Sequence, residues 1–164
     1  MKSYANENIL TPHKSNSSGG ILRAALPGAL FGGILLIAYF LIVKALGYHH
    51  QTNLRWINFV IIVPISAFAI SSYIRNTKGK TYLSAFIHSI SACLGSYFIL
   101  AIFMLIYLLI DQSFMNELRN LAYPELQLNQ LSIFLLIMGE GVLGSVVVSF
   151  VVLQFFKDSV RNAA

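Results

Sequence analysis

The sequence of 164 residues is short of charge and of cysteine. Asp, Glu, Lys and Arg together make up 10% of the chain, and 57% of the residues are hydrophobic. A soluble domain usually carries about 25% charged residues, so this shortage excludes an ordinary cytosolic enzyme and a nucleic-acid-binding domain. The excess of basic over acidic residues, 11 against 6, does not change this, because the charges lie between apolar runs. The single cysteine excludes an intrachain disulfide and a thiolate zinc cluster.

What the chain does have is four long apolar stretches. About 20 apolar residues suffice for a helix to cross a hydrocarbon core of roughly 30 Å. The sequence therefore predicts an all-α fold, an integral membrane four-helix bundle over residues 21–157, in contact with the lipid bilayer. We expect residues 1–20 to form a flexible cytoplasmic tail without a signal peptide, and residues 158–164 to form a cytoplasmic C-terminal tail. The predicted spans are approximately residues 24–45, 56–74, 81–110 and 131–156.

The distribution of Lys and Arg predicts the orientation of the bundle. With four spans, both termini and the second loop share one side, and that side holds eight of the eleven basic residues. The positive-inside rule then places both termini in the cytoplasm. Three basic residues cluster at the second loop, where we expect them to contact anionic lipid headgroups: Arg75, Lys78 and Lys80.

The loop over residues 111–130 precedes the last span and carries apolar residues at helical spacing. These residues are Phe114, Met115, Leu118, Leu121 and Ala122. The spacing indicates either a short amphipathic helix at the outer surface or a loop packed over the end of the bundle.

Glu140 is the most informative single residue, because an acid inside a membrane span is a functional-site hypothesis. Similar depths on the other helices would bring three positions to its level: Tyr39 or Leu36, Ser66, and Tyr97 or Ala101. Two roles stay open for Glu140: it binds a proton or a cationic solute, or it holds helices together through a hydrogen bond. His88 lies nearer the cytoplasmic side, either as part of a proton relay or hydrogen-bonded to a neighbouring group.

Small residues at a spacing of four predict close helix packing, because they let another backbone approach in lipid. This packing would serve either a compact bundle or the pairing of protomers. The string that begins at Gly139 also matches a dinucleotide-binding fingerprint, but it lies inside an apolar span and lacks the strand and the solvated loop that such a site needs. The predicted packing residues are Gly28, Gly32, Gly141, Gly144, Ser145 and Ser149.

No nucleophile lies beside a base in the sequence, and no metal-binding or paired-acid motif is present. We therefore expect no catalytic residue, no cofactor and no metal. The leading hypothesis is a non-enzymatic membrane protein that is an accessory subunit of a larger complex or a self-associating homo-oligomer. The alternative is a small proton-coupled transporter that uses Glu140.

The chain resembles a family of small bacterial inner-membrane proteins classed as a domain of unknown function (number four-one-nine-nine). The resemblance covers roughly residues 21–157 and rests on the four-span plan, the glycine-rich first span, the outer loop and residues 139–157. It implies a multi-pass protein of the bacterial cytoplasmic membrane and supplies no activity. Small multidrug transporters are similar in their four helices and membrane glutamate, but theirs lies in the first helix, whereas Glu140 lies in the fourth span.

Overall fold

The structure, a computed structural model, describes residues 18–47, 56–76, 81–121 and 129–161. All regular secondary structure in these ranges is helical, and four helices are long and apolar enough to cross a membrane. The predicted all-α four-helix bundle is thereby confirmed, and the chain is a multi-pass membrane protein. The helices are α1 (Ser18–Ala45), α2 (Trp56–Asn76), α3 (Tyr82–Ile110), α4 (Gln112–Leu121), α5 (Gln130–Phe155) and α6 (Lys157–Arg161).

The four candidate spans agree closely with the predicted ones. The structure gives Ala24–Ala45, Trp56–Asn76, Tyr82–Ile110 and Gln130–Phe155. Polar N-caps begin two of them: the Thr81 side chain accepts a hydrogen bond from the Ser84 amide, and the Asn129 side chain accepts one from the Ser132 amide.

Both predicted tails are partly helical. The last three residues of the predicted N-terminal tail belong to α1, which begins at Ser18, and most of the predicted C-terminal tail belongs to α6. Residues 1–17 and 162–164 lie outside the described part of the chain.

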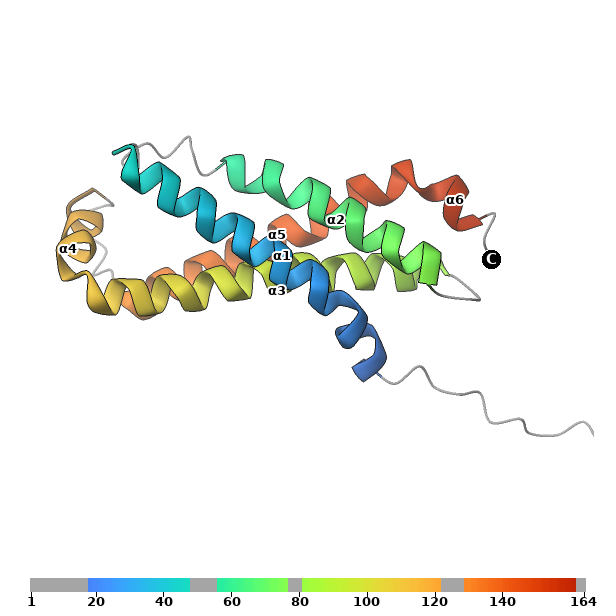
Figure 1. The fold of residues 1–164 in the computed structure, drawn as a ribbon, viewed down its shortest axis with the longest axis horizontal. Coiled ribbons are helices and arrows are strands. Elements are labelled where there is room, and N and C mark those ends of the chain that lie inside the picture. Colours follow the sequence, from blue (N-terminus) through green and yellow to red (C-terminus); the bar gives the residue numbers. More distant parts are fainter. Residues whose placement is uncertain (1–17, 48–55, 77–80, 122–128, 162–164) are drawn as a thin grey trace, which may run out of the picture.

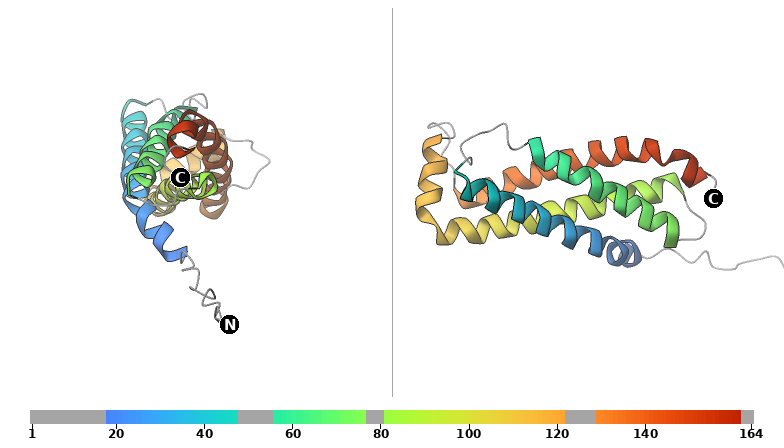
Figure 2. Two further views of the ribbon diagram at one scale, coloured as in Figure 1. Left: turned by 90° about the vertical axis from the view of Figure 1, so that its right-hand side faces the viewer. Right: turned by 45° about the horizontal axis from the view of Figure 1, so that its top comes forward.

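Helices α1, α2, α3 and α5 run side by side, with α3 in contact with the other three (Figure 1). Helix α4 lies across one end of the bundle, and α6 lies at the opposite end (Figure 2). We refer to these as the α4 end and the α6 end. The connections make α1 and α3 run from the α6 end to the α4 end, while α2 and α5 run the opposite way.

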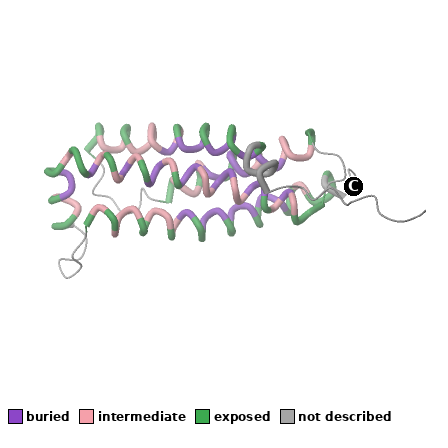
Figure 3. Tube along the Cα trace, turned by 90° about the horizontal axis from the view of Figure 1, so that it is seen from below, coloured by how far each residue is buried: buried purple, intermediate pink, exposed green. Residues whose placement is uncertain are grey.

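Small and polar side chains share the interior with large apolar ones such as Ile62 and Leu108, while other large apolar side chains cover the outside. Figure 3 shows buried and exposed positions alternating along the helices. Ala85, Ala92 and Ala101 are fully buried, whereas Phe31 and Leu143 are largely exposed. Lipid is as apolar as these exposed side chains, so close contact between small residues holds the helices together. The distribution is that of a bundle whose outer surface faces lipid.

The first span packs on the third through two of its predicted packing residues. A Cβ atom on Gly32 would lie 2.6 Å from the Ile65 Cδ1 atom and would also overlap the Ser96 hydroxyl, and one on Gly28 would lie 3.3 Å from the Ala92 Cβ atom. Only glycine at position 32 allows α1 this close to both neighbours.

Helix α4 combines the two alternatives raised for the outer loop. It is amphipathic, with Phe114 and Met115 buried against the bundle while Gln112 and Asn116 are exposed. It therefore covers the end of the bundle as a helix. The side chains of residues 121 and 122 lie outside the described part of the structure.

Candidate functional site: a polar core between α2, α3 and α5

Three serine hydroxyls from three different helices meet in the interior. The Ser66 Oγ atom of α2 lies 2.7 Å from the Ser89 Oγ atom of α3, which lies 2.8 Å from the Ser149 Oγ atom of α5. All three side chains are fully buried. A hydroxyl both donates and accepts, so the row is hydrogen-bonded within itself. We call these residues the serine cluster.

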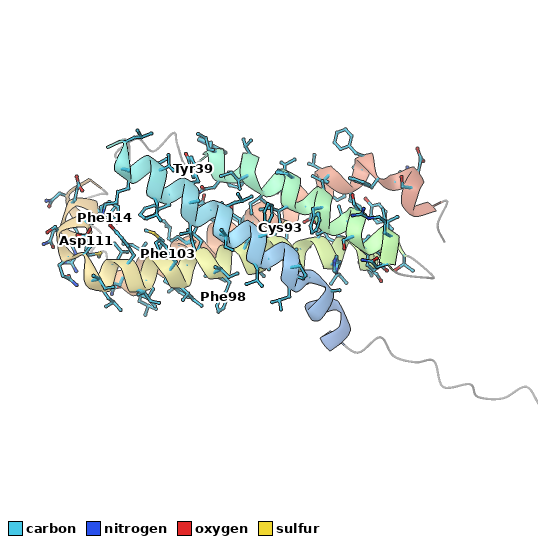
Figure 4. The ribbon with its side chains drawn as sticks, in the orientation of Figure 1. Tyr39, Cys93, Phe98, Phe103, Asp111 and Phe114 are labelled. Atoms are coloured by element: carbon cyan, nitrogen blue, oxygen red, sulfur yellow. The ribbon has the colours of Figure 1, made fainter. Side chains whose placement is uncertain are left out.

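The only cysteine adjoins this cluster. Cys93 lies one turn beyond Ser89 on α3, is fully buried, and its thiol faces all three serine hydroxyls. Figure 4 shows it in the interior of the bundle. We did not predict Ser89 or Cys93 as site residues, although their spacing of four, with Tyr97 a further four residues on, is the signal that places them on one face of α3.

One turn beyond Cys93, the Tyr97 ring lies against two glycines of α5. A Cβ atom on Gly141 would lie 2.6 Å from the Tyr97 Cβ atom. One on Gly144 would lie 2.7 Å from the Phe59 Cε1 atom and 3.5 Å from the Tyr97 hydroxyl oxygen. The glycines thus make room for an aromatic ring between α3 and α5, and this predicted packing face is used inside the bundle.

Two buried hydroxyls continue the polar core beyond the serine cluster. Among the residues that the structure describes, the hydroxyls of Tyr97 and Ser145 are buried and lack a hydrogen-bond partner. Ser145 lies one turn before Ser149 on α5. The two unpartnered hydroxyls therefore lie on the side of the serine cluster that faces the α4 end.

Glu140 lies beside Tyr97. It is half-buried and directly precedes Gly141, whose backbone packs against the Tyr97 side chain. The structure therefore brings Glu140 and Tyr97 together, as the depth count along the helices predicts. Tyr39 is half-buried on α1 (Figure 4).

Ser66 does not lie at the level of Glu140, and this depth prediction is wrong. Through Ser89, Ser66 is joined to Ser149, which is nine residues from Glu140 on α5, or about 13 Å at 1.5 Å per residue. The prediction assumed that all spans begin at the same depth in the membrane. In the structure Phe59, near the start of α2, packs against Gly144, in the middle of α5, so α2 begins deeper than α5. Figure 1 shows α2 beginning well inside the bundle from the α4 end.

His88 lies on the other side of the serine cluster from Glu140. It is buried, and its ring lies 5.6 Å from that of Tyr73, centroid to centroid, at an interplanar angle of 36°. Because His88 directly precedes Ser89, it is close in depth to the serine cluster and far from Glu140. The structure thus provides no direct pair of His88 with Glu140.

A second cluster, which the sequence analysis missed, joins α1 to the junction of α3 and α4. The Lys44 Nζ atom lies 2.7 Å from an Asp111 carboxylate oxygen and donates a hydrogen bond to the Tyr107 hydroxyl. It also lies 4.4 Å from the centroid of the Tyr107 ring and 4.5 Å from that of Phe114, a cation–π arrangement. Figure 4 shows Asp111 and Phe114 together at this end. We call these four residues the lysine cage.

The lysine cage also affects the charge of its carboxylate. The hydrogen bond from Lys44, and then that from the Phe114 backbone amide, lower the pKa of Asp111 below its ordinary value. Asp111 is therefore ionised across the physiological pH range and holds the end of α1 on α4.

The predicted lipid-contacting residues are described only in part. Arg75 is exposed in the last turn of α2, at the α6 end, and Lys78 and Lys80 lie outside the described residues. In the part of the chain that the structure describes, no three His, Cys, Asp or Glu side chains are grouped as metal ligands.

Comparisons with known proteins add no further assignment. No protein-family model, no curated protein and no solved structure matches this chain. The resemblance to the small inner-membrane family stays a prediction. The sequence and the fold thus define a multi-pass membrane protein with a polar core and four membrane-length helices.

Proposed function

We propose that this chain is a non-enzymatic membrane protein that serves as a packed unit of a larger membrane assembly, either as an accessory subunit or as a homo-oligomer. The serine cluster supports the proposal, because its hydroxyls form hydrogen bonds with one another and thereby connect α2, α3 and α5. Ser96 acts in the same way between α3 and α1, since its hydroxyl donates to the Ala29 carbonyl at 3.2 Å. Hydrogen bonds of this kind between helices stabilise helix association in lipid.

The native mass of the tagged protein, gently extracted from its own membranes, tests this proposal. We expect a mass that contains other chains or several identical copies. The same protein, purified and returned to lipid alone, is the control that separates self-association from a larger complex. A single copy in both preparations would contradict the proposal.

A second candidate, a small proton-coupled transporter, is favoured by the polar core. Glu140 lies beside Tyr97, and the Tyr97 and Ser145 hydroxyls, which are buried without hydrogen-bond partners among the described residues, lie between Glu140 and Ser149 of the serine cluster. A carboxyl group in this position can take up a proton from one side of the membrane and release it to the other, which is how transporters use membrane acids.

Proton flux into liposomes with an enclosed pH-sensitive dye tests this candidate. We expect a flux through the wild-type protein that Glu140→Gln abolishes and that Glu117→Gln, a matched change on α4 outside the spans, leaves intact. Labelling of buried Cys93 with a maleimide dye checks that both variants remain folded. A wild-type flux no greater than that of empty liposomes would exclude the transporter.

We also propose the bacterial cytoplasmic membrane as the location, with the α6 end in the cytoplasm. The resemblance supports the membrane, and the excess of Lys and Arg supports the orientation. Ser113 on α4 and Ser159 on α6 are both exposed at opposite ends. An impermeant maleimide should label Ser113→Cys in intact spheroplasts and Ser159→Cys only after lysis. The reverse pattern would refute the orientation, and the parent protein with buried Cys93 is the control.

A further inference from the structure

A surface pocket of about 460 Å³ lies at the α6 end, between α2 and the segment where α5 leads into α6. Its size falls within the range of about 300–1,000 Å³ that is usual for small-molecule sites. Figure 1 shows the end of α2 and α6 at the same end of the bundle. The lining residues are Ala67, Phe68, Ser71, Ile74, Arg75, Phe156 and Ser159.

The lining combines apolar walls with groups that bind phosphate. Four of the seven residues are apolar, and the polar ones are two serines and Arg75, with no acid among them. A guanidinium group binds phosphate through two parallel hydrogen bonds, and a hydroxyl can donate another. Because no acid in the lining balances Arg75, the pocket matches an amphiphile that has a phosphate group and a net negative charge, rather than a zwitterionic one.

The order of these groups along α2 matches the depth of a membrane lipid. Phe68, Ser71 and Arg75 follow one another at spacings of three and four, so they lie on one face of the helix. Phe68 is inside the span, and Arg75 is in its last turn, about 10 Å farther towards the membrane surface at 1.5 Å per residue.

We propose that this pocket is a specific site for one anionic phospholipid. The phosphate group binds Arg75 with the Ser71 and Ser159 hydroxyls, and an acyl chain lies along Phe68. A free phosphate ion would leave the apolar wall unused, whereas a lipid reaches the pocket directly from the bilayer. Among the described residues Arg75 forms no ion pair, so its guanidinium group is available to the lipid. This site is independent of both functions proposed above.

Native mass spectrometry of the full-length protein tests the site. Phosphatidylglycerol and phosphatidylcholine with identical acyl chains are added to the protein in mild detergent, and the bound lipid is counted. We expect the protein to retain phosphatidylglycerol about five-fold better than phosphatidylcholine, the effect of one basic residue near an anionic headgroup. Arg75→Gln should abolish this preference. Arg119→Gln, a matched change on α4 at the opposite end, should preserve it.

A second pair of variants keeps the test decisive if Arg75→Gln alters the fold. Ser159→Asp places a carboxylate in the pocket and should lower phosphatidylglycerol retention, whereas Ser113→Asp on α4 should not. Equal retention of the two lipids by the wild-type protein would overturn the proposal. So would an equal loss of the preference for phosphatidylglycerol in Arg75→Gln and Arg119→Gln. Displacement of the lipid by millimolar inorganic phosphate would assign the site to a free anion instead.

Discussion

Gly139 and Gly141 lie two residues apart on α5, and their surroundings differ. A Cβ atom on Gly139 would have no atom within 4 Å, whereas one on Gly141 would lie 2.6 Å from the Tyr97 Cβ atom and 2.7 Å from its Cγ atom. The Tyr97 Cβ atom is attached to the backbone of α3, so a rotamer change cannot remove the overlap. Alanine at position 141 must therefore push α3 and α5 apart.

The expected cost follows from this overlap. One extra methyl group in a well-packed interior costs about 1–3 kcal/mol. The higher helix propensity of alanine, about 1 kcal/mol, is common to both positions and cancels in the comparison. Gly141→Ala should therefore be about 1–3 kcal/mol less stable than Gly139→Ala, a difference of roughly five-fold to 160-fold in the unfolding equilibrium.

Cys93 provides the assay, because it is the only cysteine and is fully buried. Its reaction with a maleimide dye reports unfolding in detergent micelles as denaturant is added. We expect Gly141→Ala to become reactive at a lower denaturant concentration than Gly139→Ala. If the two transitions coincide, or if Gly141→Ala is the more stable, the Tyr97–Gly141 contact does not limit the approach of α3 and α5.

Three other variants and a change of pH test the two clusters. Ser89→Ala removes both hydrogen bonds of the serine cluster, and each contributes about 0.6 kcal/mol in a membrane. The free energy of unfolding, measured by Cys93 labelling, should therefore fall by about 1 kcal/mol. Ser91→Ala removes a hydroxyl that, within the described structure, donates to the Ile87 carbonyl of its own helix, so its unfolding free energy should fall by less. Lys44→Met should lower the hydrogen-exchange protection of α4 and leave α5 unchanged. Because Lys44 lowers the pKa of Asp111, the wild-type protection of α4 should persist above about pH 4 and fall as pH drops through the lowered pKa. Loss of that protection at neutral pH would contradict the assignment.

The number and extent of the spans could be predicted from the sequence, since crossing a membrane is a local requirement. A charge-free run of sufficient length forms a helix in lipid, whatever the other runs do. The run predicted over residues 56–74 and the observed helix Trp56–Asn76 differ by only two residues at one end. The same local reasoning found the amphipathic helix α4 but did not decide how it packs.

The candidate site could be predicted only in part. Glu140 is recognisable because an acid among apolar residues stands out, and its neighbour Tyr97 follows from equal depth on α3 and α5. The same count fails for Ser66, because α2 enters the bundle deeper than α5 does. Relative depth depends on how the helices are offset, and no single apolar run contains that information.

The sequence by itself thus determined that four apolar helices span a membrane and that one of them carries an acid. Only the tertiary structure decided which polar groups meet. Small and polar residues at helical spacing mark a face on a span, but nothing within one span indicates which residues of the other spans that face will meet. The contacts of Gly32 and Gly141 set the rotations of the helices, and they bring Ser89 to Ser149, 60 residues away, and Lys44 to Asp111, 67 residues away.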